Sequence, residues 1–520
     1  MYQFLYDQNK DRLGNVALNY FDNKITYKDF FDNVDHVAKA LYQSNIRQGD
    51  IVSIVSLGTP ETIYCIYALN RIGAVANLLT ANITSSELEQ NIIETKTKLL
   101  FVLDIVADKI GEFNCRVPVI YLSISDSVRG VKKLLLSLKK RSKQRMSFKS
   151  FLNKEKGTFD FVENNGEELA IVVYTSGSTG NPKGVMLSNR NINAEAIMCS
   201  LTGKNYVPGE KFLNNIPPFF SFGIGMMHLA FSTGMTVVVA LIPETKNIIK
   251  MMKKYRPERY VMGPAFTDVI EKYDGNDLSF LVDLTGGGGA ISEEQETELN
   301  RRLKKCNCSL EYITGYGMTE FGATVCTNMN RCKRYRSLGI PFAKANVKVI
   351  DIESKQELKY GQVGEIYFST PSLMKGYWGR ADNEDFIIDN GEKWFATGDL
   401  GHVDEDGFVF FDGRIKRIFI TRDVDGTVYK VFPQRIEEAI MSHPAVELCG
   451  TVGREDKERT TVMISFVKMK SNSSCVSKEE ILRFLSYKLS TYAMPEDIVF
   501  VDEIPTTQSG KIDYRELEKH

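Results

Sequence analysis

Hydrophobic positions in the first 120 residues alternate between helical and strand spacing. After Thr26-Tyr-Lys-Asp29, apolar residues recur three and four positions apart, which predicts an amphipathic helix; they are Phe30, Val34, Val37, Ala38 and Leu41. Residues 50–55, 99–103 and 117–122 are short, β-rich apolar runs, each typical of a buried strand. Strands that alternate with helices predict an α/β fold with a buried parallel sheet.

Three further patterns place elements later in the chain. Residues 235–242 form the longest apolar run; it falls far short of the ~20 residues of a membrane span and predicts a buried strand. Pro433 precedes Ile436 and Ile440 and suits the first turn of a helix. Ser477-x-x-Glu480 is a capping box that predicts an amphipathic helix through Ile481, Leu482, Leu485 and Leu489.

Composition narrows the class of protein without naming a reaction. The chain has 520 residues, of which 43% are hydrophobic and 25% are charged. Sixty-five Lys and Arg against 66 Asp and Glu leave a net charge of −1, which argues against a nucleic-acid partner and against disorder. Residues 1–10 lack a basic segment followed by an apolar one, so we expect no signal peptide and a cytoplasmic protein without a transmembrane segment.

Two local features add alternatives. Residues 129–149 carry many Lys and Arg and no Asp or Glu, with interleaved leucines. A basic amphipathic helix there could dock on an anionic membrane or a partner, but a solvated surface helix in a connecting segment is the favoured interpretation. Cys306 and Cys308 form a C-x-C that no second Cys/His pair completes, so zinc is a poor prediction and scattered buried thiols a better one.

A glycine- and hydroxyl-rich loop follows the apolar run that ends at Val173. It reads Tyr174-Thr-Ser-Gly-Ser-Thr-Gly-Asn-Pro-Lys-Gly184. Glycines let backbone N–H groups approach phosphate oxygens, hydroxyls donate further hydrogen bonds, and Lys183 supplies a positive charge. The flanking apolar runs disfavour a flexible linker, and the residue order is not that of a Walker A loop. The pattern therefore predicts a polyphosphate loop.

The order T-S-G-S-T-G-x-P-K-G closely resembles the adenylate-forming superfamily, which includes acyl- and aryl-CoA synthetases, peptide-synthetase adenylation domains and firefly luciferase. Further motifs recur in the family's order: Gly315-Tyr-Gly-Met-Thr-Glu320, Gly364-Glu-Ile-Tyr, Met374-Lys-Gly-Tyr-Trp378, Trp394-Phe-Ala-Thr-Gly-Asp399, Asp412-Gly-Arg-Ile-Lys416 and Pro505-Thr-Thr-Gln-Ser-Gly-Lys511. Because they span most of the chain in register, the protein is identified as a member, most like acyl- or aryl-CoA ligases. Nothing in the chain singles out a luciferase-like oxidase.

The resemblance implies a fold and a division of the chain. We expect an α/β protein whose large N-terminal domain, residues 1–413, holds layered α/β subdomains and a β-barrel-like part. A small, mobile α+β C-terminal domain, residues 414–520, would carry the catalytic Lys511. Lys416 falls at the family's hinge, about which the small domain rotates so that one site serves two reactions.

The resemblance also implies an activity. We expect an ATP-dependent ligase that joins a carboxylic acid, fatty or aryl, to AMP with release of pyrophosphate, and then forms a thioester with coenzyme A. The expected cofactors are ATP, Mg²⁺ and coenzyme A, or the phosphopantetheine arm of an acyl- or aryl-carrier protein. The expected partner is a small-molecule carboxylic acid, with such a carrier protein as the partner in the alternative.

By resemblance, fifteen residues bind the nucleotide: Thr175, Ser176, Gly177, Ser178, Thr179, Gly180, Lys183, Gly287, Gly288, Tyr316, Gly317, Thr319, Asp399, Arg414 and Lys511. Within this set, Thr319 would contact the α-phosphate and Tyr316 would stack on adenine. Asp399 would accept both ribose hydroxyls, as a carboxylate can, assisted by Arg414.

Four residues are the predicted catalytic group: Lys511, Thr319, Glu320 and Lys183. Glu320 would ligate Mg²⁺, a hard cation that prefers carboxylate oxygen. Lys511 would bridge the α-phosphate and the substrate carboxylate.

The predicted acid pocket comprises Phe219, Phe220, Phe222, Gly223, Gly288, Gly289, Gly315 and Met318. Phe220 stands where many acyl- and aryl-CoA ligases have His, which favours an apolar wall. The segment 216–225 has no acidic residue to hold an ammonium group, so amino-acid activation is less favoured. The glycines of residues 286–289 could leave room for a wide or long acid, or form a plain flexible turn.

The acceptor stays open at this stage. Where many CoA ligases have a short segment after the hinge, residues 421–431 are longer and more acidic, and Asp423 and Asp425 would not attract the phosphates of coenzyme A. A carrier protein is therefore a real alternative acceptor. A nucleotide-binding protein without catalysis is disfavoured because Thr319, Glu320, Asp399, Arg414 and Lys511 are all present.

Overall fold

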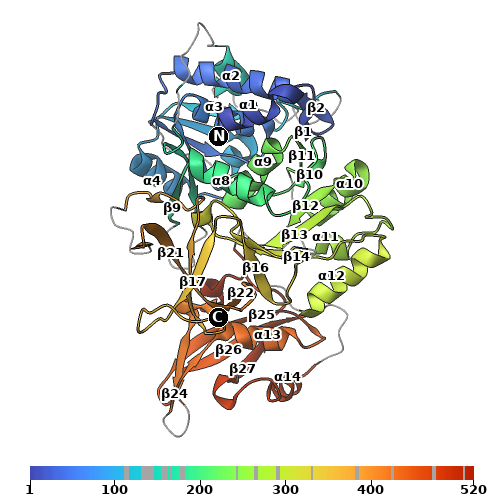
Figure 1. Cartoon of the computed structure of the whole chain (residues 1–520), viewed down its shortest axis with the longest axis vertical. Helices are drawn as coiled ribbons and strands as arrows, with labels where there is room; N and C mark the ends of the chain where they lie inside the picture. Colours follow the sequence, from blue (N-terminus) through green and yellow to red (C-terminus); the bar gives the residue numbers. More distant parts are fainter. Residues whose placement is uncertain are drawn as a thin grey trace.

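A computed structural model describes residues 1–110, 116–130, 146–153, 162, 165–175, 182–241, 244–262, 268–287, 293–329, 332–380, 386–422, 427–470, 476–507 and 510–520. The described elements run from an N-terminal α/β part, through a central β-rich part, to a small C-terminal part at the opposite end (Figure 1). Among these residues, no helix combines the length and apolar character needed to cross a membrane.

The first sheet lies in the N-terminal part and is parallel at its centre. Its strand order is β19 (Gly376–Tyr377), β9 (Gly184–Ser188), β8 (Leu169–Tyr174), β4 (Val75–Leu79), β3 (Ile51–Val55), β5 (Leu99–Leu103), β6 (Val119–Leu122) and β7 (Met146–Ser147). The predicted strands over 50–55, 99–103 and 117–122 are therefore confirmed, the last with a later start. Pro118 explains that start in part, because it has no N–H to donate to the ladder.

The helix predicted after Thr26 is confirmed as α2 (Tyr27–Gln43). The Thr26 side chain accepts from the Asp29 N–H and the Asp29 carboxylate accepts from the Thr26 N–H, so two otherwise unpaired donors are satisfied. The helix buries Phe30, Val34 and Leu41 on one face. Also in this part are α1 (Tyr2–Asn9), η1 (Lys10–Arg12), α3 (Pro60–Arg71), α4 (Ser85–Thr95), α5 (Asp104–Ile110) and α7 (Phe148–Leu152).

A second, longer sheet passes through the centre of the molecule. Its order is β17 (Asn346–Ile350), β18 (Gly364–Ser369), β21 (Glu392–Val403), β22 (Val409–Arg414), β16 (Ser337–Pro341), β15 (Cys326–Thr327), β14 (Ile313–Tyr316), β13 (Asp283–Gly287), β12 (Arg259–Met262), β10 (Lys211–Asn214), β11 (Thr236–Val239), β1 (Val16–Tyr20) and β2 (Asn23–Thr26), with β20 (Phe386–Asp389) on β21. Strands β10 to β14 are parallel with their neighbours in that stretch, whereas β15 to β22 pair antiparallel.

Helices pack beside this second sheet. The apolar run predicted as a strand contains the fully buried β11 (Thr236–Val239), while its last residue, Ile242, lies outside the described residues. Helices α8 (Asn189–Ser200) and α9 (Ser221–Ser232) pack against each other. A separate apolar cluster lies under α10 (Thr245–Tyr255), α11 (Asp268–Glu271) and α12 (Glu293–Lys305).

The C-terminal part has two small apolar cores of its own. Its elements are η4 (Ile415–Arg417), β23 (Phe419–Arg422), β24 (Val428–Val431), α13 (Pro433–Met441), β25 (Val446–Asp456), β26 (Thr460–Met469), α14 (Lys478–Leu485), η5 (Thr491–Ala493), β27 (Asp497–Phe500) and α15 (Tyr514–Leu517). Both predicted helices are confirmed, with Pro433 at the first turn of α13 and the Ser477 side chain accepting from the Glu480 N–H at the start of α14. Leu489 lies beyond the end of α14.

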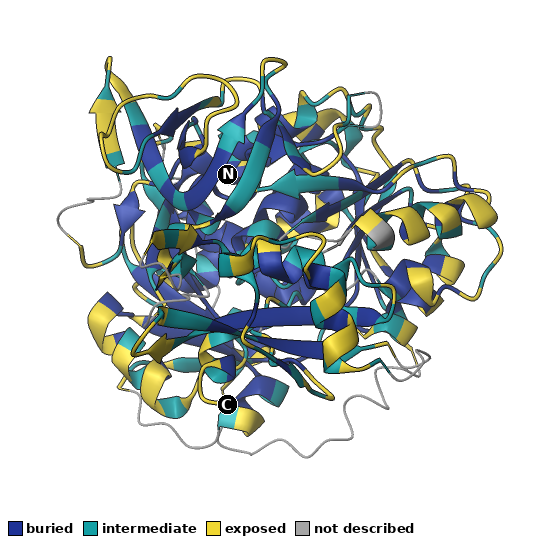
Figure 2. Ribbon diagram, turned by 90° about the horizontal axis from the view of Figure 1, so that it is seen from below, coloured by how far each residue is buried: buried dark blue, intermediate teal, exposed yellow. Residues whose placement is uncertain are grey.

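Burial follows this arrangement: buried residues concentrate in the strands and on the inner helix faces, and exposed residues on outer helix turns and loops (Figure 2). The predicted fold class, a mixed α/β protein with a large N-terminal and a small C-terminal part, is confirmed. Most of the basic segment, residues 131–145, and the acidic residues Asp423 and Asp425 lie outside the described residues.

Candidate active site

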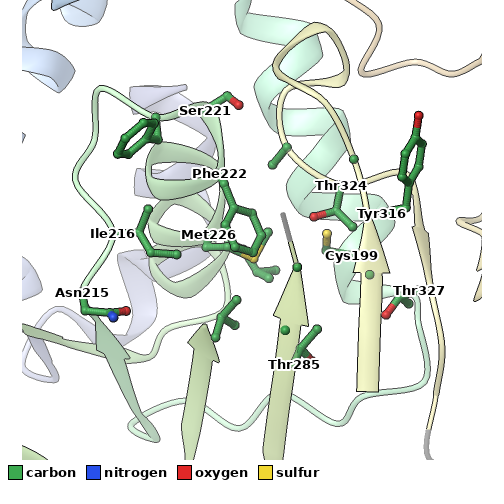
Figure 3. A pocket seen from close by; sticks show the side chains of 18 of the residues that line it. Cys199, Asn215, Ile216, Ser221, Phe222, Met226, Thr285, Tyr316, Thr324 and Thr327 are labelled. Carbon is green, nitrogen blue, oxygen red and sulfur yellow. The ribbon is translucent and has the colours of Figure 1, made fainter. Parts of the chain in front are cut away.

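A cavity of about 510 Å³ lies between helix α9, the carboxyl ends of β13 and β14, and the C-terminal segment around Thr506 and Lys511. Phe222 and Met226 point from α9 toward the strands that carry Thr285 and Tyr316 (Figure 3). Of the predicted acid pocket, five members line this cavity: Phe219, Phe220, Phe222, Gly315 and Met318. Gly288 and Gly289 lie outside the described residues.

Gly223 has a different place from the one predicted. It is buried in the first turn of α9 and is not among the residues that line the cavity. A Cβ on Gly223 would lie 2.1 Å from the Pro217 carbonyl oxygen, a distance that no side chain tolerates. Gly223 therefore allows the 216–220 segment to fold back over the helix start, which positions the neighbouring Phe219, Phe220 and Phe222.

The predicted phosphate loop connects two antiparallel strands. Strands β8 and β9 form a hairpin in which Tyr174 faces Gly184. At its mouth, the Thr175 N–H donates to the Lys183 carbonyl (3.0 Å), and the Lys183 N–H donates to Thr175 Oγ1 (3.3 Å). The two ends of the loop are thus held together. Residues 176–180, which include Ser176, Gly177, Ser178, Thr179 and Gly180, lie outside the described residues.

Glu320 forms a second part of the site, beside this hairpin. It lies in η3 (Thr319–Phe321) with only 5% of its surface exposed, and burial raises the pKa of its carboxyl group. The Tyr377 hydroxyl donates to Glu320 Oε1 (2.8 Å), and Lys183 Nζ lies 4.5 Å from the centre of the Tyr377 ring. Tyr377 belongs to the motif at 374–378, but its sequence position alone does not reveal that it supports Glu320.

Tyr316, Asp399 and Arg414 form a third part of the site. Asp399 and Arg414 are cross-strand partners on β21 and β22, and Arg414 Nε lies 2.9 Å from Asp399 Oδ1. The Tyr316 hydroxyl donates to Asp399 Oδ2 (2.7 Å), and burial together with the Asp399 charge raises the pKa of Tyr316. The three residues predicted to bind adenosine are therefore brought together around one buried carboxylate. Tyr316, Gly317 and Thr319 also line the cavity.

Lys511 reaches this cluster from the far end of the chain. It lines the cavity with Thr506, Thr507 and Gly510, and the Thr507 N–H donates to the Lys511 carbonyl (2.7 Å). Its side chain is open to the cavity, but the surrounding protein and the Arg414 charge lower the pKa of its ammonium group, while Asp399 and Glu320 oppose that shift. Two of the four predicted catalytic residues, Lys511 and Thr319, thus line one cavity. Glu320 lies close enough for its charge to act on Lys511, and Tyr377 contacts both Glu320 and Lys183.

The sequence did not indicate a buried carboxyl group directly behind the cavity wall. Glu195 on α8 is 1% exposed, and its Oε1 accepts from the thiol of Cys199, which lines the cavity. Its Oε2 has no hydrogen-bond partner within the described residues, and burial raises the pKa of Glu195 to about 7. Nothing in the local sequence N-I-N-A-E-A marks this residue as unusual.

Glu195 predicts a pH dependence of stability. Because its pKa is 4.5 when exposed and about 7 when folded, the native state holds the extra proton, and the free energy of unfolding should fall as pH rises from 4.5 to 7. Over that range the free energy of unfolding should fall by about 3 kcal/mol in total, and above pH 7 this contribution of Glu195 no longer changes. Urea denaturation at pH 5 and pH 8 should show a smaller pH difference for Glu195→Gln than for the wild type. An unchanged difference would contradict this assignment. Glu61→Gln, measured in the same way, gives the separate contribution of Glu61, another buried carboxyl group whose pKa is raised to about 7.

Comparisons with known proteins agree with these motifs. A family model described as "AMP-binding enzyme" matches residues 5–378, and one for the "AMP-binding enzyme C-terminal domain" matches residues 435–511. The chain is 27% identical to a 4-coumarate–CoA ligase-like protein of Arabidopsis thaliana over 96% of this chain and 88% of the other. It is 25% identical to a long-chain-fatty-acid–CoA ligase of Bacillus subtilis over 96% of this chain and 91% of the other. The solved structure of ATP-bound MatB from Rhodopseudomonas palustris superposes with a TM-score of 0.85 at 22% identity, covering 100% of this chain and 98% of that one.

Proposed function

The chain belongs to the AMP-binding enzymes of the adenylate-forming superfamily, and from that premise we propose that it activates a fatty or aryl acid as its acyl-adenylate and transfers the acyl group to coenzyme A. It is an AMP-forming acid–thiol ligase of the acyl-CoA synthetase type. The observation that carries the proposal is that Lys511 and Thr319 line the same cavity as Phe219, Phe220 and Phe222, with the Glu320 charge close enough to act on Lys511.

In the first reaction, an oxygen of the substrate carboxylate attacks the α-phosphorus of ATP. The new O–P bond forms as the bond to pyrophosphate breaks, and charge accumulates on the phosphoryl oxygens. We assign stabilisation of that charge to Lys511 and Thr319, and we assign the β- and γ-phosphates to Thr175, Lys183 and the loop between them. The resting contacts of Asp399 with Tyr316 and Arg414 support its assignment to the ribose, because that carboxylate is already oriented.

Glu320 fits the role of a Mg²⁺ ligand. A buried carboxylate whose ionised form is disfavoured is stabilised by a bound cation, and Mg²⁺ commonly takes one or two carboxylates together with substrate phosphates. Bound there with ATP, the ion would neutralise phosphate charge. Tyr377 would orient the carboxylate by its hydrogen bond to Oε1.

For the second reaction, we propose that the thiol of coenzyme A attacks the carbonyl carbon of the acyl-adenylate, forming the thioester and releasing AMP. Relatives named CoA ligases that align over almost the whole chain support this acceptor. We retain residues 414–520 as the mobile domain and Lys416, in the short η4 turn, as its hinge. Two exposed ion pairs cross that boundary and would break on rotation: Lys430 with Glu353 (2.7 Å), and Arg336 with Glu438.

The test is ATP–pyrophosphate exchange over a panel of fatty, aryl and amino acids, followed by thioester formation with coenzyme A and with a loaded carrier protein. We expect exchange with at least one fatty or aryl acid and thioester formation with coenzyme A. No exchange with any acid would refute the activity. Thioester formation on the carrier protein alone would favour the other acceptor, for which the acidic residues Asp423 and Asp425 provide the argument.

Gly287 allows a sharp prediction about the width of the acid. A Cβ there would lie 3.4 Å from the Gly315 carbonyl oxygen and 3.9 Å from the Phe222 ring, which are ordinary contacts. Gly287→Ala should therefore fold but narrow the pocket, lowering kcat/KM for a wide aryl acid such as naphthoate about tenfold or more while sparing a short one such as butanoate. Equal losses for both acids would contradict a role in pocket width.

The neighbouring glycine provides the contrast. A Cβ on Gly286 would lie 1.7 Å from the Tyr312 hydroxyl on the opposite face of β13. Gly286→Ala should lower the Tm strongly rather than change acid preference.

A further inference from the structure

The acid pocket does not stay apolar along its length. The cavity extends past Phe222 and Met226 to Lys204, Arg259 and Asp283, three charged side chains that also line it. All three are largely buried, with side-chain exposures of 18%, 3% and 7%. None belongs to a motif that the sequence marks, and none takes part in the activity proposed above.

Strand register places these charges at the end of the pocket away from the nucleotide. Side chains alternate along a strand, so Asp283, Thr285 and Gly287 share the cavity face of β13, while Leu284 packs into the helical cluster behind. Four residues at ~3.3 Å each put Asp283 about 13 Å from Gly287. Arg259 on β12 lies beside Asp283 on β13, and Val261 lies beside Thr285. The charged residues of the two strands are therefore neighbours at the same end of the pocket.

The Arg259 guanidinium still has donor capacity for a ligand. Lys204 Nζ donates to Asp283 Oδ1 (2.8 Å), Asp283 Oδ2 (3.0 Å) and Thr285 Oγ1 (2.7 Å), which uses its three protons. Arg259 Nε pairs with Glu210 (2.6 Å), and Nη2 donates to the Asn205 carbonyl. Arg259 Nη1, however, lies 3.6 Å from Asp283 Oδ2, beyond ordinary hydrogen-bond length.

We infer that this distal cluster binds an oxygen atom of the substrate, so that the activated acid carries a second, neutral polar group such as a hydroxyl or carbonyl at the end away from its carboxylate. A plain alkyl end would be pressed against buried charges without satisfying them, which is unfavourable. Lys204 and Arg259 balance Asp283 and Glu210 in charge, which favours a neutral group over a second carboxylate. The inference rests on the proposed function, whose acid site it specifies.

The test compares acids that differ only at the far end: decanoate, ω-hydroxydecanoate and the dicarboxylate of the same length, and an aryl acid with and without a para-hydroxyl. Binding to the full chain is measured by calorimetry without ATP, and ATP–pyrophosphate exchange is measured in parallel. We expect the hydroxylated acids to bind about tenfold more tightly than their parents, the gain of one buried hydrogen bond. Equal or tighter binding of both parents, or strongest binding of the dicarboxylate, would overturn the inference.

The variant Arg259→Met/Glu210→Leu removes the Nη1 donor together with the ion-pair partner of Arg259, and Asp283 keeps its pairing with Lys204, so no lone buried charge is left. It should lose or reverse the preference for the hydroxylated acids, and retained preference would overturn the inference. Lys348→Met/Asp389→Leu, a lysine–aspartate pair with a buried lysine outside the cavity, is the matched control and should keep the wild-type preference. If the first variant does not fold, Arg259→Lys keeps a positive charge beside Glu210 but has no Nη1 group, and it should still weaken the preference. Tighter binding of the hydroxylated acids without ATP–pyrophosphate exchange would refute the proposed function but would still support the inference about the cluster.

Discussion

Lys511→Ala should lose adenylation by about 10²–10³-fold while ATP binding persists. Lys511 is the positive side chain that the C-terminal segment brings to the cavity, near Glu320, Asp399 and Arg414. Its charge acts on the phosphoryl oxygens and the attacking carboxylate, whereas the ribose and the terminal phosphates contact other residues under our proposal. ATP–pyrophosphate exchange measures the loss, and calorimetry with ATP measures binding.

Lys519→Ala is the matched control for that experiment, because Lys519 is an exposed lysine of the same C-terminal segment and pairs only locally with Glu516. It should leave both readouts unchanged. Loss of ATP binding in Lys511→Ala with intact exchange would contradict the assignment. Because the surrounding protein and the Arg414 charge lower the pKa of Lys511, we also expect wild-type exchange to decline on the alkaline side at a pH below the ordinary lysine value of 10.5.

Glu320→Gln should reduce exchange by a similar 10²–10³-fold and weaken the dependence on Mg²⁺. Gln retains the shape and can accept from the Tyr377 hydroxyl, but it removes the negative charge that we assign to the cation. Exchange measured against Mg²⁺ concentration, with ATP in fixed excess, reports the loss. The same variant should be more stable than the wild type at neutral pH, because the buried carboxylate has a raised pKa and its ionised form opposes folding.

Tyr377→Phe separates orientation from charge in the same experiment. It keeps the ring next to Lys183 and the Glu320 carboxylate, and removes only the hydroxyl that donates to Oε1. We expect an intermediate loss of exchange with Mg²⁺ dependence retained. Full exchange at unchanged Mg²⁺ dependence in Glu320→Gln would show that this carboxylate does not hold the ion.

Much of the fold follows from local sequence. Thr26 and Asp29 satisfy the first donors of α2 wherever that helix packs, and Pro433 suits the first turn of α13, so both helix starts were predictable. The apolar run of β11 has the length of a strand and is fully buried, as a central position in a sheet requires. Gly223 shows the limit of this approach. Its motif pointed to the pocket, but its role depends on how closely the Pro217 carbonyl, six residues earlier, folds back onto it, and the residue types alone do not reveal that path of the backbone.

The same distinction applies to the candidate site. The residue types, their order and the family followed from the sequence alone, because each motif is a contiguous string whose chemistry is local: a phosphate loop, a Thr-Glu pair, a terminal lysine. Only the tertiary structure decided which of them meet. The register of β21 with β22 sets Asp399 against Arg414, the fold of the C-terminal part brings Lys511 to Glu320, and the pairing of β12 with β13 builds the charged pocket end with Lys204. Such contacts join residues from 15 to 191 positions apart, and tertiary arrangement, including strand pairing, rather than local propensity, determines them.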